Sequence, residues 1–133
     1  MKLDHATIVT PHLEAVRHFF LHIVGLTEGT RPPFSFEGHW LYQDDKPIIH
    51  LIKSYSNHPP AKTPSRIDHI AFRVADETEW NALTTRLQEE GIASQTAEVP
   101  ATGERQLFVV PTPGVAIEFV ITSRRRPIKS MPD

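Results

Sequence analysis

The sequence contains no cysteine, and this absence excludes several kinds of site at once. A chain of 133 residues without cysteine forms no disulfide, no thiolate metal site and no cysteine nucleophile. Any metal ion must therefore be held by imidazole and carboxylate groups. Eight histidines and sixteen acidic residues can supply both.

Long hydrophobic runs and an excess of charge are also missing. No uncharged apolar run approaches the roughly 18 residues of a membrane span, and the first residues, Met1 and Lys2, lead directly into a predicted strand without an apolar signal segment. The net charge is only −2. We therefore expect a cytoplasmic protein, with no nucleic acid and no membrane as partner.

The sequence repeats itself, with a histidine at the same place in each copy. The segment Leu3–Val9 reads LDHATIV, and IDHIAFRV follows at Ile67–Val74, 64 positions later. Each half also ends in a predicted strand with a metal-type residue at its centre, which is His50 in the first half and Glu118 in the second. A repeat with ligand-type residues at the start and end of each unit indicates a site built into the architecture.

Hydrophobic periodicity predicts the same order of elements in both halves. In the first half we expect a strand at 3–10, a helix that begins after Thr10-Pro11 and ends at Gly25, and strands near 27–30, 38–44 and 47–53. In the second we expect a strand at 67–74, a helix that begins at Asp76 with Glu79 in a capping box and ends at Gly91, and strands near 93–99, 104–110 and 115–122.

This pattern predicts an α+β fold made of two βαβββ units. We expect one domain at 3–122, with units 3–53 and 67–122 joined by the polar segment 54–66, and a basic C-terminal tail at 123–133. We expect the Arg124–Arg126 run to be a flexible part of the tail; the alternative is a contact with a second subunit.

Four residues are candidate metal ligands. Glu118 lies between Ile117 and Phe119, and strand alternation turns it away from the face on which these neighbours pack. A carboxylate enclosed there needs a cation or a histidine as partner. Because the four residues occupy matching places in the repeat, we expect one divalent metal ion. The predicted metal ligands are His5, His50, His69 and Glu118.

The paired βαβββ plan, with these residues on its strands, resembles the vicinal oxygen chelate superfamily. That family includes glyoxalase I, methylmalonyl-CoA epimerase, fosfomycin-resistance thiol transferases, bleomycin-resistance proteins and extradiol dioxygenases. The resemblance covers residues 3–122. It rests most specifically on Asp4-His5, Asp68-His69 and the ending from Pro113-Gly114 to Ile117-Glu118. It implies a U-shaped mixed sheet around a divalent metal that holds two neighbouring oxygens of a substrate.

The resemblance also implies roles for the four residues. His5, His69 and Glu118 match a set of two histidines and one carboxylate, which leaves positions for substrate. Glyoxalase I often has a carboxylate where this chain has His50. We expect His50 to be a fourth ligand, because its place in the first unit corresponds to that of Glu118. The alternative is an acid–base residue beside the metal, and we expect His50 and Glu118 to be the catalytic residues.

Several functions remain open at this point. We favour a metalloenzyme with iron or manganese and chemistry related to extradiol dioxygenases, although Leu107–Val110 lacks the tyrosine that those enzymes usually carry in their later strands. The alternatives are a lyase or isomerase of glyoxalase or epimerase type, with nickel, zinc, cobalt or manganese, a drug-binding resistance protein, and a thiol transferase. The retained ligand positions argue against the drug-binding protein. We expect a homodimer, because the repeat leaves open sheet edges.

Three further expectations concern residues outside the ligand set. Arg73 lies on the ligand face, where an anion clamp and a surface salt bridge are the alternatives, and we favour the salt bridge. Trp40 is expected to pack in the core. Three histidines, His12, His18 and His22, are expected on the solvated face of the first helix.

Overall fold

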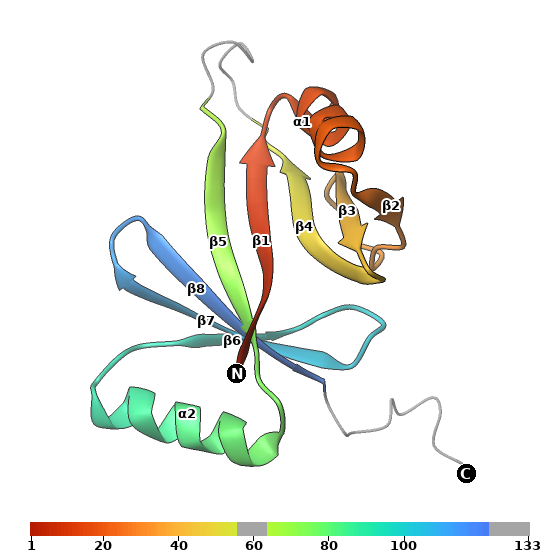
Figure 1. Ribbon diagram of the computed structural model, residues 1–133. Helices are drawn as coiled ribbons and strands as arrows, with labels where there is room; N and C mark the ends of the chain where they lie inside the picture. The colour runs from red at the N-terminus through yellow and green to blue at the C-terminus, as the bar shows by residue number, and fades with distance from the viewer. Residues whose placement is uncertain (56–63, 123–133) are drawn as a thin grey trace. The chain divides into compact units, whose positions relative to one another are not determined.

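The protein consists of two helix-bearing halves with the same succession of elements (Figure 1). The computed structural model describes residues 1–55 and 64–122. The first half contains β1 (Lys2–Thr10), α1 (Leu13–Phe19), a π-helical turn η1 (Phe20–Val24), β2 (Thr27–Gly29), β3 (Gly38–Gln43) and β4 (Lys46–Lys53). The second contains β5 (Arg66–Arg73), α2 (Glu77–Glu89), β6 (Gln95–Glu98), β7 (Glu104–Thr112) and β8 (Val115–Thr122). The predicted α+β class and the βαβββ order are confirmed.

The strands form one mixed sheet of eight strands in the order β2-β3-β4-β1-β5-β8-β7-β6. In each half the first strand is hydrogen-bonded to the last, which is β1 with β4 and β5 with β8. The pair β1 and β4 is parallel, whereas β2 with β3, β3 with β4, β6 with β7 and β7 with β8 are antiparallel. The repeat in the sequence is therefore also a repeat in strand order, and it places His5 and His50 on hydrogen-bonded neighbours.

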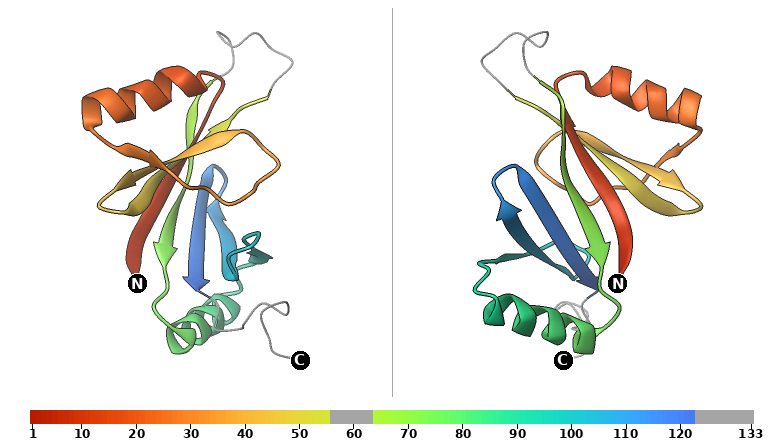
Figure 2. Two further views of the ribbon diagram at one scale, coloured as in Figure 1. Left: turned by 90° about the vertical axis from the view of Figure 1, so that its right-hand side faces the viewer. Right: turned by 60° about the vertical axis from the view of Figure 1, so that its left-hand side comes forward.

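The chain divides into two compact units, residues 4–70 and residues 1–3 with 71–133. In the first unit α1 covers β3 and β4, and Figure 2 shows it beside these strands. Four buried leucines form the centre of this core: Leu13, Leu26, Leu41 and Leu51. Because one face of the strands is used for this packing, the residues that alternate with it, such as Thr7 on β1 and His50 on β4, lie on the other face.

In the second unit α2 covers β7 and β8 (Figure 2). Its core contains Val74, Trp80, Leu83, Leu107, Val109 and Ile121, with Ile117 and Phe119 packed against it. The helix begins as predicted, because the side chain of its N-cap Asp76 accepts a hydrogen bond from the Glu79 N–H at 2.9 Å. The Glu79 carboxylate reaches back to the N–H of Ala75, one residue before the expected partner.

The end of the first helix differs from the expectation. A regular helix up to Gly25 would place the apolar residues Ile23 and Val24 near the core, but they are 72% and 52% exposed. The helix widens into the π-helical turn at Phe20, and the N–H of Gly25 bonds to the carbonyl of Phe20 at 3.0 Å. The wider turn shifts the positions that face the core. Gly25 ends the helix as predicted, with a left-handed φ of 90°.

Other sequence predictions fall partly or wholly outside what the structure describes. The single domain at 3–122, the joint at 54–66 and the basic tail at 123–133 stay predictions, and residues 56–63 and 123–133, which include Arg124–Arg126, lie outside the described residues. Within the described part of the chain, no helix is long and apolar enough to cross a membrane.

A charge network joins α1 to the outer strands of its unit. Glu28 on β2 accepts a hydrogen bond from Arg17 Nε on α1 at 2.6 Å and also binds the ring of His39 on β3. Burial alone would raise the pKa of Glu28, but the hydrogen bonds and charges of His39 and Arg17 outweigh it. The pKa of Glu28 therefore lies below its ordinary value of 4.5.

This lowered pKa predicts how stability changes in acid. A carboxyl whose pKa is lowered by folding stabilises the protein above its unfolded-state pKa, and the contribution is lost as the pH falls through the folded-state pKa. We therefore expect Glu28→Gln to lower the free energy of unfolding near pH 7 and to flatten its decline below about pH 4.5. Urea unfolding at a series of pH values measures both effects.

The matched control is Glu37→Gln, which removes an exposed carboxylate that lies 4.0 Å from Nζ of Lys53. We expect this control to follow the wild-type pH curve closely. If Glu28→Gln also gives a curve parallel to that of the wild type, the charge network does not stabilise the fold.

Candidate metal centre

His5 is a buried histidine held by its own sequence neighbour. It lies on β1, where strand alternation turns it away from the helix-covered face, and only 6% of it is exposed. Its Nδ1 is 2.7 Å from Oδ2 of Asp4. A carboxylate can only accept a hydrogen bond, so Nδ1 carries the proton. In the neutral ring Nε2 then keeps its lone pair. In this tautomer the ring can offer Nε2 to a metal ion.

His69 repeats this arrangement on β5. Its Nδ1 lies 2.9 Å from Oδ2 of Asp68, and Oδ1 of the same carboxylate accepts a hydrogen bond from Arg66 Nε at 3.0 Å. Burial alone would raise the pKa of Asp68, but hydrogen bonds from His69 and Arg66 outweigh it and the pKa lies below its ordinary value. Asp68 is therefore an ionised acceptor near neutral pH, and His69 has the same tautomer as His5.

His50 lies in a stack of three rings that crosses neighbouring strands. Its ring centroid is 3.7 Å from that of His5 and 4.0 Å from that of Trp40, with interplanar angles of 15° and 12°. The His50 Nε2 lies 3.1 Å from the carbonyl oxygen of Pro47 and donates to it, because a carbonyl only accepts. His50 is thus held on both faces and at one edge. The stack explains the half-buried environment of Trp40, which was expected to pack in the core.

Glu118 is a buried carboxylate on β8. Its neighbours Ile117 and Phe119 pack against the core under α2, so Glu118 points to the opposite face, as alternation predicted. Only 2% of Glu118 is exposed. Gln106 on β7 donates its amide N–H to Oε2 of Glu118 at 3.1 Å. Gln106 was missed from sequence, although strand pairing gives a signal: Phe108 faces Glu118, and Gln106 lies two residues before Phe108.

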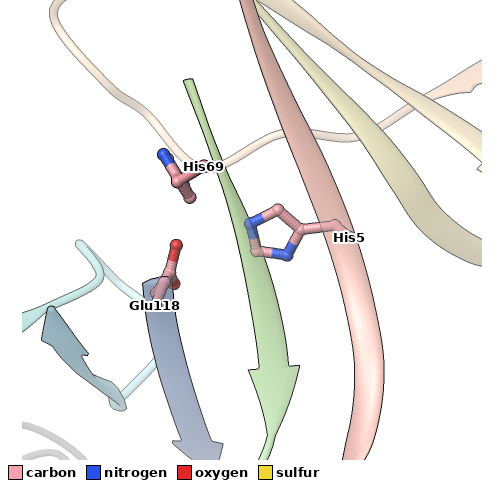
Figure 3. Close-up of side chains that lie close together, drawn as sticks. All are labelled: His5, His69 and Glu118. Atoms are coloured by element: carbon pink, nitrogen blue, oxygen red, sulfur yellow. The ribbon is translucent and has the colours of Figure 1, made fainter. Parts of the chain in front are cut away.

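Three of the four predicted ligands form one group. A ligand atom from each of His5, His69 and Glu118 lies within 4.8 Å of the other two (Figure 3). Two ligands of one metal ion lie at most about 4.2 Å apart, since each metal–ligand bond to nitrogen or oxygen is about 2.1 Å. The bound of 4.8 Å is close to that distance, so the three side chains are suitably placed for one ion. Ligation by His50, which is not part of this group, stays a prediction.

Arg73 and the histidines of the first helix are not part of the group formed by His5, His69 and Glu118. Arg73 donates to Glu104 Oε2 at 2.7 Å and to Thr122 Oγ1 at 3.1 Å, so the predicted salt bridge is confirmed. The helix histidines, His12, His18 and His22, are exposed as predicted. The rings of His18 and His22 lie 4.2 Å apart at the surface. Two adjacent imidazoles can retain metal adventitiously, which matters for any measurement of metal content.

Comparison with known proteins agrees with this architecture. Residues 2–119 match the family model described as Glyoxalase/Bleomycin resistance protein/Dioxygenase superfamily. No curated protein matches the sequence.

Three solved structures illustrate the similarity of fold. The 2,3-dioxygenase LapB from Pseudomonas sp. KL28 superposes with a TM-score of 0.72 at 18% identity, over 91% of this chain and 40% of LapB. Methylmalonyl-CoA epimerase from Mycobacterium tuberculosis gives 0.66 at 20% identity, over 92% of this chain and 88% of the epimerase. A hypothetical protein from Bacillus halodurans C-125 gives 0.68 at 21% identity, over 95% and 97% of the two chains. The chain thus spans well under half of LapB.

Proposed function

Because the chain belongs to the glyoxalase/bleomycin resistance protein/dioxygenase superfamily, we propose that it is a metal-dependent enzyme whose one divalent ion is held by His5, His69 and Glu118. The proximity of these three ligand atoms is the observation that carries the proposal. Two imidazoles and one carboxylate suit iron, manganese, cobalt, nickel or zinc, and such a set leaves positions for a substrate. The substrate would be a small molecule that chelates the metal through two neighbouring oxygens.

The chain's own residues have distinct tasks in this proposal. His5 and His69 keep their Nδ1 protons on Asp4 and Asp68 and direct Nε2 to the ion. Glu118 supplies the one negative charge among the three ligands, and Gln106 fixes one of its oxygens. When bound, a divalent ion in such a set acts as a Lewis acid toward the substrate oxygens.

For the reaction, we favour chemistry of the extradiol-dioxygenase kind. Two of the solved structures with a similar fold are those of a 2,3-dioxygenase and of a catechol dioxygenase. The second candidate is a lyase or isomerase of the epimerase kind. It is favoured by length, because this chain covers 88% of methylmalonyl-CoA epimerase but only 40% of LapB. In both, His50 and Glu118 are the candidate groups for proton transfer.

Metal analysis of protein purified without chelators separates these reactions. Iron, together with oxygen uptake when a catechol is added, is the result expected for the dioxygenase. Nickel, zinc or cobalt without oxygen uptake supports the lyase or isomerase. Protein that binds no divalent ion at any tested concentration contradicts both.

The ligand set predicts the effect of removing its carboxylate. We expect one Zn²⁺ per chain, and we expect Glu118→Gln to weaken its binding by at least about 100-fold, because the only anionic ligand is lost. Isothermal titration measures affinity and stoichiometry. The matched control, Glu98→Gln, neutralises an exposed carboxylate in the same unit and should bind normally.

His18→Ala is used as the background for these titrations, because it removes the surface pair of His18 and His22. If Glu118→Gln in this background still binds one ion at wild-type affinity, Glu118 is not a ligand.

His50 can be assigned by two substitutions that differ only in whether a ring remains. We propose that its ring supports His5, since the two are stacked and His50 Nε2 donates to Pro47. His50→Phe should then keep Zn²⁺ affinity within about threefold, whereas His50→Ala should weaken it by about 10-fold, a typical loss for a residue that supports a ligand. Equal and larger losses in both variants would establish His50 as the fourth ligand.

We also propose a homodimer. The sheet ends at β2 and β6, whose residues are exposed along their whole length, and small domains tend to cover such edges. Light scattering at micromolar concentration should give twice the mass of 15.1 kDa. A monomer mass across the micromolar range contradicts this.

A further inference from the structure

The aspartate before each candidate histidine ligand occupies the same place in both repeats. Asp4 precedes His5 at the start of β1, and Asp68 precedes His69 at the start of β5. In each pair the aspartate Oδ2 meets the histidine Nδ1, at 2.7 Å and 2.9 Å. Adjacent residues of a strand point to opposite faces, so alternation alone does not bring these side chains together. The hydrogen bond from histidine Nδ1 to the preceding aspartate is nevertheless present in both repeats.

We propose that Asp4 and Asp68 are positioning residues for the metal centre, which fix the tautomer of His5 and His69 so that both present an unprotonated Nε2. This inference rests on the proposed function, because it concerns the same two histidines. It assigns a role to residues that do not touch the ion. A carboxylate is the side chain that enforces this tautomer, since it accepts a hydrogen bond and cannot donate one.

An amide at the same position would fit the space but would not enforce the tautomer. Asparagine can accept from Nδ1–H with its oxygen, or donate to an unprotonated Nδ1 with its NH₂ group. The second arrangement moves the proton to Nε2, which then cannot bind a metal. The corresponding replacement beside the catalytic imidazole of serine proteases keeps the geometry and selects the wrong tautomer.

The two pairs are not equally constrained. The His5 side chain is 5% exposed and that of Asp4 21%, against 13% and 33% for His69 and Asp68. His5 is also stacked on His50. The Asp68 carboxylate, in contrast, accepts a second hydrogen bond from Arg66 in addition to the one from His69. A hydrogen bond between more buried partners is stronger, because water competes with it less. We therefore expect Asp4 to have a larger effect than Asp68.

The first experiment needs no metal. Long-range ¹H–¹⁵N NMR of the metal-free protein distinguishes Nδ1–H from Nε2–H imidazoles. We expect His5 and His69 to be Nδ1–H tautomers in the wild type, and the affected histidine to populate the Nε2–H tautomer in Asp4→Asn or Asp68→Asn. If either histidine is already an Nε2–H tautomer in the wild type, the inference is wrong.

The second experiment measures Co²⁺ affinity and the visible spectrum of bound Co²⁺, which reports its ligands. Outer partners of ligating histidines typically contribute 10- to 100-fold to metal affinity. We expect losses of affinity in this range, and we expect Asp4→Asn to bind Co²⁺ more weakly than Asp68→Asn. Once the site is saturated, the spectrum of each variant should be close to that of the wild type. The control is Asp76→Asn, which keeps a good helix cap and should not change Co²⁺ binding.

The controls His5→Ala and His69→Ala separate this inference from the proposed function. If neither weakens Co²⁺ binding, the proposed metal centre is wrong. If both weaken it but the Asp4 and Asp68 variants stay within threefold of the wild type, the centre stands and the inference is overturned. Thermal unfolding without metal checks that the variants fold; should Asp4→Asn not fold, the more exposed Asp68 carries the test.

Discussion

Side chains on a β-strand alternate between its two faces, and in each unit of this protein a helix occupies one of them. The helix α1 packs on Leu41 and Leu51, and α2 packs on Leu107 and Ile121. Once these faces are used for the core, every second residue of the same strands must lie on the other face. Glu118 is there because its neighbours Ile117 and Phe119 pack against the core under α2, and His5 is there because it alternates with Ile8, which packs against the core under α1. The candidate metal centre therefore depends on hydrophobic packing that involves none of its ligands.

This constraint explains why much of the fold could be predicted from the sequence. The apolar periods of the two helices, the Asp76 cap and Gly25 each act through local backbone geometry, which a sequence carries directly. The repeat extended the predicted βαβββ succession from one half to the other, because two copies of one unit adopt the same arrangement. The end of α1 could not be predicted in this way. Its widening into a π-helical turn moves Ile23 and Val24 out of the register that a regular helix would give.

The candidate site was predictable in its residue types but not in its contacts. Matching positions in the repeat identified His5, His69 and Glu118. The same symmetry suggested that His50 would act like Glu118, but His50 lies between the rings of Trp40 and His5. Stacking across β1, β4 and β3 depends on strand register and on rotamers, and neither is encoded by spacing within one strand. The bond from Gln106 to Glu118 was missed for the same reason.

The central claim is that one divalent ion is bound by His5, His69 and Glu118. Its most direct test is an anomalous-scattering map from crystals of the protein loaded with Zn²⁺, recorded at the zinc absorption edge. The account predicts one strong peak per chain, about 2.0–2.2 Å from Nε2 of His5, Nε2 of His69 and a carboxylate oxygen of Glu118. A peak bound through Nδ1 of either histidine, or peaks only at surface residues such as His18 and His22, would contradict it.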